Sequence, residues 1–376
     1  MTGHRHGNDD IANARNAPAS APMSGFAVLR HVAKAKMRYA GIRAGLEVTA
    51  LASRAPLFSG LGGRGLVFTL HHVRPAGDEP DFAPNAHLSV TPSFLEEAIG
   101  VARESGLVPV HLHDLPALLS DQADDRKFVA FTLDDGYRNN AEHAAPVFRR
   151  FGVPYTIFVC AGFTERKRTI WWETAAALLG AVDTLTFDFG AGPERLSVVT
   201  YRQKAAAFAR LVSFVQTLEE DEAVARIDDV ARAAGIDPMA IVEALVMDEG
   251  ELRWLAEDPL VHFGAHTLTH VNLRRVGTDR LKEETLSSAH AVERYVGAWP
   301  RSFAYPYGSP SAAAEREAKA TVEAGFDVAV TTQPGVLTAQ SFDRPALLPR
   351  VSLNGLFQKP RHVRALISGL PFKLPA

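Results

Sequence analysis

Cysteine is almost absent from this sequence of 376 residues, since Cys160 is the only one. A single cysteine excludes an internal disulfide and any zinc site built from several thiolates. No stretch approaches the roughly 18 to 20 apolar residues that a membrane-spanning helix needs. An excess of charge is also missing, because the formal net charge is only −3. The composition therefore indicates no polyanionic partner, and we expect no binding of nucleic acid.

The residues that are present predict a globular protein with four unequal parts. Hydrophobic residues make up 47% and charged residues 22% of the chain, which is ample material for a core. Residues 1–24 are small and polar, and they are predicted to form a disordered tail without the features of a signal peptide. A basic helical segment at 25–60, a catalytic domain at 61–356 and a basic C-terminal tail at 357–376 follow.

The basic segments bear on where the protein resides. Residues 26–51 alternate apolar side chains with lysine and arginine in a helical pattern. Such a helix can lie on an anionic membrane surface, but packing on its own domain is commoner and is the interpretation we favour. We therefore expect a cytoplasmic protein with at most weak peripheral contact with the inner membrane face. No feature identifies a protein partner.

Strands and helices alternate along most of the chain, which predicts an α/β fold with a parallel sheet. Strands are expected at 66–70, 107–112, 128–131, 154–160, 260–264, 302–305, 327–331 and 346–352. The alternation of strands and helices is interrupted at about 163–250, where a hairpin and several alanine-rich helices predict a mainly helical insertion. No function for this insertion follows from its sequence.

Polar residues follow several of these strands at the point where each strand ends. They are His71, Asp134, Asp135, His266, His270, Tyr305 to Tyr307 and Arg350. In a β/α barrel the carboxyl ends of the strands form one rim, which carries the catalytic residues. Because scattered surface residues would have no reason to follow strands in this way, we predict a barrel rather than an open sheet.

Two of these stretches together predict a metal centre. Asp134 and Asp135 follow a buried strand, and His266 and His270 are spaced i, i+4 after another. Alone, the first would more often be a surface turn and the second a surface pair. Together, one carboxylate and two imidazoles leave coordination positions open, as in catalytic zinc sites, although non-haem iron uses the same set. The second carboxylate favours hydrolysis, since it is a natural general base for water.

Three motifs resemble those of a known family. Residues 132–136 (TLDDG) look like the first motif of the polysaccharide deacetylases, also described as the nodulation-protein-B homology domain or carbohydrate esterase family four. Residues 266–270 (HTLTH) look like the second motif, and 303–308 (FAYPYG) resemble the third. The resemblance runs from about Leu66 to Leu353, interrupted by the insertion. It implies a deformed (β/α)7 barrel that removes N-acetyl groups from amino sugars.

The resemblance also implies a role for individual residues. Asp134 would be the general base, and the backbone N–H of Tyr307 would help to hold the oxyanion. A divalent cation, usually zinc, would be bound by Asp135, His266 and His270. Substrate contacts are expected from Gly136, Tyr305, Pro306 and Tyr307.

Two departures from the family pattern concern the residues around the base. Ala304 stands where members often have an arginine, and the last strand lacks the histidine that often protonates the leaving amine. These features look more like the branch that acts on β-1,6-linked N-acetylglucosamine polymers. In that arrangement Arg350 replaces the arginine, and His71 or His72 replaces the acid. We choose His71 as the acid, because alternation along a strand sends His72 to the other face. The alternative is that these histidines only pack in the core or cap a strand end.

The sequence thus predicts a metal-dependent hydrolase that releases acetate from an N-acetylated sugar. One alternative is the same chemistry on a non-sugar amide such as a ureide, as in allantoinase-like members. A second is a catalytically silent relative that only binds carbohydrate. Binding alone needs no general base, so the intact pair of Asp134 and Asp135 favours an enzyme.

Overall fold

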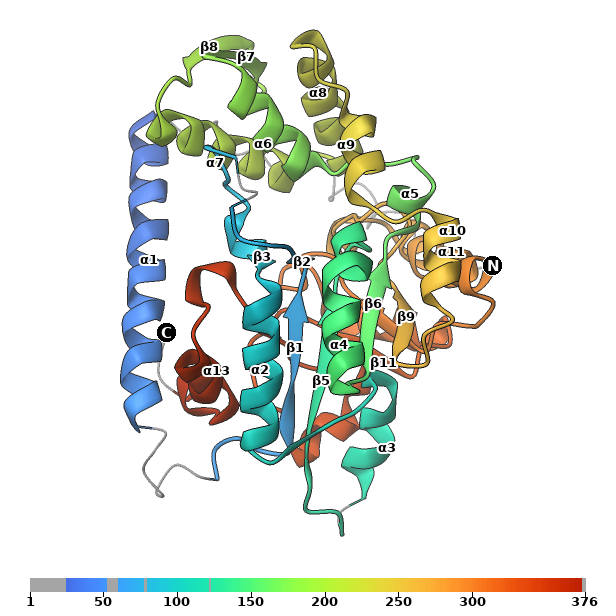
Figure 1. The fold of residues 1–376 in the computed structure, drawn as a ribbon. Helices are drawn as coiled ribbons and strands as arrows, with labels where there is room; N and C mark the ends of the chain where they lie inside the picture. The colour runs from blue at the N-terminus through green and yellow to red at the C-terminus, as the bar shows by residue number, and fades with distance from the viewer. Residues whose placement is uncertain (1–24, 53–59, 78–79, 122, 374–376) are drawn as a thin grey trace, which may run out of the picture.

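The computed structural model describes residues 25–52, 60–77, 80–121 and 123–373. The predicted disordered tail at 1–24 lies outside the described residues. Figure 1 shows a central sheet covered by helices, with a second group of helices at one end. This arrangement agrees with the α/β fold and the helical insertion that the sequence predicts.

A curled parallel sheet forms the centre of the molecule. Its strands are β1 (Gly65–Leu70), β4 (Leu107–Pro109), β5 (Lys127–Leu133), β6 (Tyr155–Val159), β9 (Val261–Ala265), β10 (Ser302–Ala304), β11 (Val328–Val330) and β12 (Val351–Ser352). Seven of them follow the order β11-β10-β9-β6-β5-β1-β12, and β4 pairs with the start of β5. Every residue of β1 and β6 is buried, as expected for parallel strands with both faces covered.

The two edges of this sheet come together through the segment before β12. Leu348 exchanges backbone hydrogen bonds with the β11 region, donating to Ala329 and accepting from Thr331. Three residues later, Val351 pairs with Phe68 of β1. The sheet therefore curls into the deformed (β/α)7-type barrel that the sequence predicts. The predicted strand at 346–352 is shorter than expected, because a single 3₁₀ turn (Pro345–Leu347) precedes it.

Helices cover the outside of the curled sheet. They are α2 (Pro92–Glu104), α3 (Leu115–Ser120), α4 (Ala145–Phe151), α11 (Thr278–Val296) and α12 (Glu315–Glu323). Thr91 caps α2 as predicted, since its side chain accepts a hydrogen bond from the N–H of Phe94. Short strands β2 (His72–Val73) and β3 (Ser89–Val90) pair beside the barrel.

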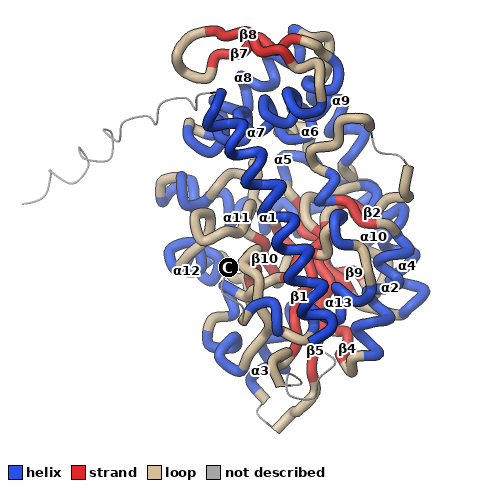
Figure 2. The backbone as a smooth tube through the Cα atoms, turned by 90° about the vertical axis from the view of Figure 1, so that its left-hand side faces the viewer, coloured by secondary structure: helices blue, strands red, loops and turns tan. Residues whose placement is uncertain are grey.

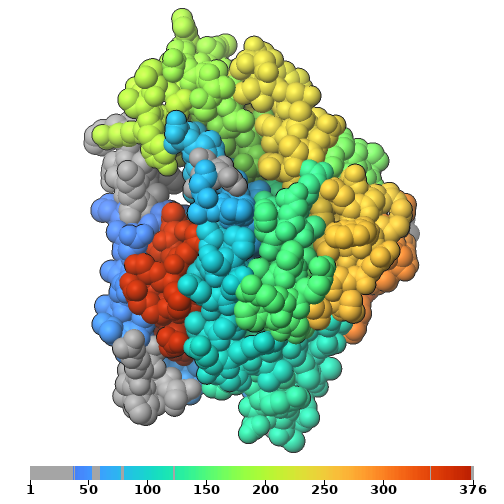
Figure 3. All heavy atoms as spheres, viewed as in Figure 1, coloured from blue at the N-terminus to red at the C-terminus, as the bar shows by residue number. Residues whose placement is uncertain are grey.

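The insertion forms a cap with a hydrophobic core of its own. It contains α5 (Ala161–Thr164), α6 (Trp171–Ala181), the hairpin β7 (Thr184–Asp188) and β8 (Pro193–Ser197), α7 (Tyr201–Thr217), α8 (Glu220–Ala233), α9 (Pro238–Leu245) and α10 (Glu249–Leu255). In Figure 3 this cap occupies one end of the molecule. Its core also takes in Phe82 and Tyr137, which belong to the barrel's own segments. The cap is thereby continuous with the carboxyl ends of the strands.

The two outer helices of the chain pack together. Figure 2 shows α1 (Gly25–Ala52) running past α13 (Pro360–Ile367). Leu46 and Ala50 are buried against Ala365, and Glu47 pairs with Arg361 at 2.7 Å. The stretch predicted as a basic tail is thus a helix of the folded domain. No described helix combines the length and the apolar character needed to span a bilayer.

Candidate active site

The candidate site lies where β5, β9 and β10 end. Asp134 is fixed next to β1 because its N–H donates to Leu70 O at 3.0 Å. His266 is held beside β6 because its N–H donates to Val159 O at 2.9 Å. The turns after neighbouring parallel strands therefore meet at one rim, as the sequence predicts.

Asp134 forms a buried ion pair with Arg350. The guanidinium donates to both carboxylate oxygens, with Nη1 2.6 Å from Oδ1 and Nη2 2.8 Å from Oδ2. Further hydrogen bonds from Arg350 to Thr331 O and Thr132 Oγ1 complete its environment. Burial raises the pKa of Asp134, but the charges of Arg350 and His266 outweigh burial and hold that pKa below its ordinary value. Asp134 is accordingly ionised and held in one orientation.

The two histidines after β1 have different surroundings. His71 faces the site, with Nε2 4.0 Å from Asp134 Oδ2. Burial lowers the pKa of His71 below its usual value, against the opposing charge of Asp134. His72 points away, since its ring lies 3.6 Å from the ring of Tyr137 and its Nδ1 is 2.8 Å from Asn139 Nδ2. The two side chains therefore point in different directions, although His71 lies at the bend between β1 and β2 rather than within a strand.

Asp135, His266 and His270 bring three ligand atoms together. Asp135 Oδ1 lies 3.5 Å from His266 Nε2 and 3.4 Å from His270 Nε2. Ligand atoms around a tetrahedral zinc ion are about 3.4 Å apart, so the spacing suits such an ion. Asp135 Oδ1 is buried without a hydrogen-bond partner, and a cation would satisfy it. Among the described residues this is the one such cluster of three.

A second layer of contacts orients these ligands. His266 Nδ1 lies 2.7 Å from Ala304 O, an arrangement that fixes the ring so that Nε2 is free to bind a metal. Buried Glu284 of α11 accepts hydrogen bonds from the N–H groups of Leu268 and Thr269 at 2.9 and 3.0 Å. The turn that carries both histidines is therefore anchored from outside the site.

The backbone of all three motifs is unusual. Positive φ angles occur at Asp135 (72°), Thr267 (64°), His270 (56°) and Tyr307 (63°). Side chains other than glycine seldom adopt this left-handed region, and such strain gathers at functional sites. Although Asp135 lies just after a strand, it is not on an extended backbone. Its side chain separates from Asp134 through a left-handed turn instead.

With this geometry established, comparison with known proteins identifies the family. Residues 121–328 match the profile of the family described as polysaccharide deacetylase, which is more than half of the chain. The chain belongs to the polysaccharide deacetylase family. The matched range contains the three motifs of this deacetylase, but it excludes His71 and Arg350, so their place in the site comes from the structure. No curated protein matches the sequence significantly.

Several solved structures resemble this deacetylase at low sequence identity. A polysaccharide deacetylase from Bacillus cereus is 14% identical, with a TM-score of 0.49 over 80% of this chain and 68% of that one. The deacetylase PplD from Streptococcus pyogenes, in complex with acetate, is 15% identical, with a TM-score of 0.46 over 77% and 92%. IcaB from Ammonifex degensii is 16% identical, with a TM-score of 0.46 over 77% and 91%. The family match, rather than these similarities, identifies the chain.

Two of the four predicted substrate contacts belong to the core instead. The ring of Tyr305 is fully buried, and its hydroxyl donates to Ala346 O at 2.9 Å. Pro306 is also buried. Gly136 is buried as well, and its carbonyl accepts a hydrogen bond from Met247 N at 3.1 Å. Only Tyr307 of this set is partly exposed. The prediction for Tyr305 and Pro306 is wrong because the third motif turns these side chains into the deacetylase's core.

The cap supplies contacts to the site that sequence reasoning missed. The ring of Trp172 lies 4.7 Å from that of His270, and its Nε1 donates to Tyr137 OH at 3.1 Å. Trp171 Nε1 donates to Tyr307 OH at 3.2 Å. The adjacent tryptophans at the start of α6 were the feature of the sequence that could have indicated these contacts. The cap is thus part of the active-site wall of this deacetylase.

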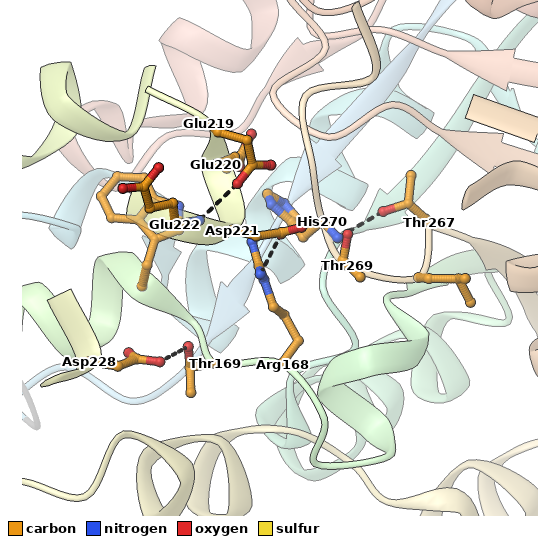
Figure 4. A network of polar contacts seen from close by, with 12 residues as sticks. Arg168, Thr169, Glu219, Glu220, Asp221, Glu222, Asp228, Thr267, Thr269 and His270 are labelled. Atoms are coloured by element: carbon orange, nitrogen blue, oxygen red, sulfur yellow. Dashed lines mark hydrogen bonds and ion pairs between the residues drawn. The ribbon is translucent and has the colours of Figure 1, made fainter. Parts of the chain in front are cut away.

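Glu220, at the start of α8, links two of the motifs. Its Oε1 accepts a hydrogen bond from Tyr307 OH at 2.6 Å, and its Oε2 accepts one from Asn272 N at 2.9 Å. Figure 4 shows this end of α8 beside His270. The carboxylate is buried. Glu220 therefore fixes the position of Tyr307 relative to the turn that carries the histidine ligands.

The surroundings of His71 and His72 predict opposite effects of removing each ring. We expect His71→Ala to keep the fold and the metal while lowering kcat roughly 10²-fold, the lower range for a general acid or base. His72→Ala should leave kcat near normal but destabilise the fold by about 1–3 kcal/mol, because a buried ring and its hydrogen bond are lost. Turnover and thermal unfolding of both variants test this. A normal kcat in His71→Ala would remove it from the mechanism.

The Glu220 link makes a prediction for positioning. Glu220→Gln should lower kcat about 10- to 100-fold without loss of metal, since small displacements in an active site are costly in rate. Glu222→Gln, on the exposed side of the same helix, is the control and should have no effect. Glu220→Ala removes the acceptor of the Tyr307 hydroxyl outright, so combining it with Tyr307→Phe should add little further loss, because both remove the same hydrogen bond. Additive losses in the double variant would contradict the link.

Proposed function

We propose that this protein is a metal-dependent deacetylase that hydrolyses the N-acetyl group of an amino sugar in an oligo- or polysaccharide. One observation carries the proposal. In a member of a deacetylase family, the ligand set of Asp135, His266 and His270 lies beside an ionised carboxylate that does not belong to the set. Metal-assisted hydrolysis of an amide uses a Lewis acid together with a base for water, and this arrangement offers a place for each.

Each residue has a task that its position supports. Asp134 accepts a proton from the attacking water, whose oxygen bonds to the acetyl carbon, and Arg350 holds the carboxylate in place. The N–H of Tyr307 donates to the oxygen that becomes negative. His71, 4.0 Å from Asp134, receives the proton and delivers it to the nitrogen as the C–N bond breaks. Acetate and a free amine leave. When bound, a divalent cation, most simply Zn²⁺, would polarise the acetyl carbonyl.

The two alternatives differ in what they need from the site. A protein that only binds carbohydrate has no use for a buried, oriented carboxylate next to a cation site. The Asp134–Arg350 pair therefore favours an enzyme over a silent relative. A ureide or another small amide would use the same groups, so the distinction lies in the substrate.

Acetate release over a panel of compounds tests the proposal. The panel should include N-acetylglucosamine oligomers of several linkages and lengths, and also acetylated amines and ureides without a sugar. We expect release from the oligomers that depends on added Zn²⁺ and stops after chelation. Release from the ureides alone would replace the sugar proposal with the amidase alternative. Binding without any release would favour the silent relative.

A further inference from the structure

A cavity of about 770 Å³ lies between the cap and the segment that follows β2. Its walls include Asp81, Phe82, Glu173, Asp183, Tyr201 and Lys204. This volume falls within the range of small-molecule sites. Figure 1 shows the segment after β2 reaching toward α6 and α7, which form the opposite wall.

The cavity and the candidate active site are linked through the first turn of α6. Trp172, in the first turn of α6, packs on the metal ligand His270 with ring centres 4.7 Å apart. The next residue, Glu173, lines the cavity, and its Oε1 lies 3.9 Å from Nε2 of His72. A chain-like ligand that occupies both the ligand set and the cavity would have to pass this first turn of α6.

Two aromatic rings give the cavity a surface suited to a sugar. Phe82 is buried, whereas Tyr201 is 53% exposed, and their ring centres are 5.5 Å apart in an edge-to-face arrangement. Aromatic side chains together with a few polar groups are typical of sites for small organic ligands.

The charge of the cavity favours a cation. Three acids, Asp81, Glu173 and Asp183, line it together with one lysine. Lys204 forms no ion pair with these acids among the described residues, since its Nζ donates to carbonyls at the end of α6, including Val182 O at 3.1 Å; its charge offsets only one of the three. Glu173 accepts a hydrogen bond from Asn85 Nδ2 at 3.1 Å, whereas no ion pair to Asp81 or Asp183 occurs within the described part of the chain. A concave surface with excess charge of one sign concentrates ligands of the opposite sign.

We propose that this cavity is a subsite for a sugar unit with a free amino group, next to the N-acetylated unit at the ligand set. The inference rests on the proposed function. An alkylammonium group is charged near neutral pH and offers three donors to carboxylates, and it also binds favourably over aromatic rings. An acetylated nitrogen has neither property. The protein should therefore prefer chains that are already partly deacetylated, and each turnover creates a better ligand for the cavity.

Binding of a fully deacetylated glucosamine tetramer, measured by calorimetry on the zinc-loaded protein, tests the subsite without any turnover. We expect the double variant Asp81→Asn, Asp183→Asn to bind it about ten-fold more weakly than wild type, and added salt to weaken wild-type binding. Tyr201→Ala should also weaken it. Asp229→Asn, an exposed acid of α8 outside the cavity, is the control and should bind normally.

The acetylated tetramer separates this inference from the proposed function. Its affinity should be the same for wild type and for the double variant. Equal affinity of wild type and double variant for the glucosamine tetramer, or no binding by either, would overturn the subsite even if acetate is released normally. Absence of acetate release together with charge-dependent binding would overturn the proposed function and leave the subsite standing.

Discussion

The Asp134→Asn variant is expected to retain its metal and to lose about 10²- to 10⁴-fold in kcat, the span usual for a general base. A carboxamide has nearly the same shape as a carboxylate, but it cannot accept a proton from water at neutral pH. Asp134 is not part of the ligand cluster, so metal content should remain at about one ion per chain. Turnover and elemental analysis of the same preparation measure both quantities.

The measurement on Asp134→Asn needs a control for stability, because Asp134 is paired with buried Arg350. Asp134→Asn leaves Arg350 without a counter-charge, and breaking a buried ion pair costs about 3–5 kcal/mol of stability. Rates should therefore be compared well below the unfolding temperature of the variant. Asp135→Asn is the matched comparison, since it should weaken metal binding as well as activity. If Asp134→Asn released the metal and Asp135→Asn kept it, the two roles would be exchanged.

Removal of one imidazole from the ligand set should abolish activity together with metal binding. We expect His266→Ala or His270→Ala to lose most of the bound ion, because two remaining protein ligands hold a divalent cation poorly. Chelation of wild type should abolish acetate release, and added Zn²⁺ should restore it. In the two variants the same addition should restore little. Metal content by elemental analysis is the direct measurement.

A histidine outside the site provides the control for these two variants. His290 lies on α11 with an exposed side chain, 3.8 Å from Glu293. His290→Ala should keep a full complement of metal and normal activity. Full metal occupancy in both His266→Ala and His270→Ala would refute the ligand assignment.

The barrel and the meeting of the motifs could be predicted because both follow from local chemistry. Buried apolar runs such as 128–131 predict strands, and parallel strands bring the residues at their carboxyl ends to one rim. His266 and Asp134 needed only that topology to come together. Arg350 does not follow this rule, because it precedes β12, and its side chain reaches Asp134 from the segment between β11 and β12. Arg350 forms the ion pair with Asp134, whereas Ala304 of the third motif carries no charge.

Sequence reasoning failed for residues whose positions depend on tertiary contacts. Tyr305 follows a strand as Asp134 and His266 do, but its ring is buried in the core against Phe303. Glu220 has no local signature, since one acid at a helix start is ordinary. Only the docking of the cap brings Glu220 to Tyr307, and no sequence pattern encodes that docking.

The left-handed turns of the three motifs place the protein in a trade-off between heat resistance and turnover. A residue other than glycine in this conformation typically costs on the order of 1 kcal/mol or more, and four such residues surround the site. Laboratory selection for a higher melting temperature alone would favour glycine or asparagine at 135, 267, 270 and 307. Such variants would survive heating but lose the side chains of Asp135 and His270. A thermostable form of this protein must therefore gain its stability in the barrel and cap, away from these turns.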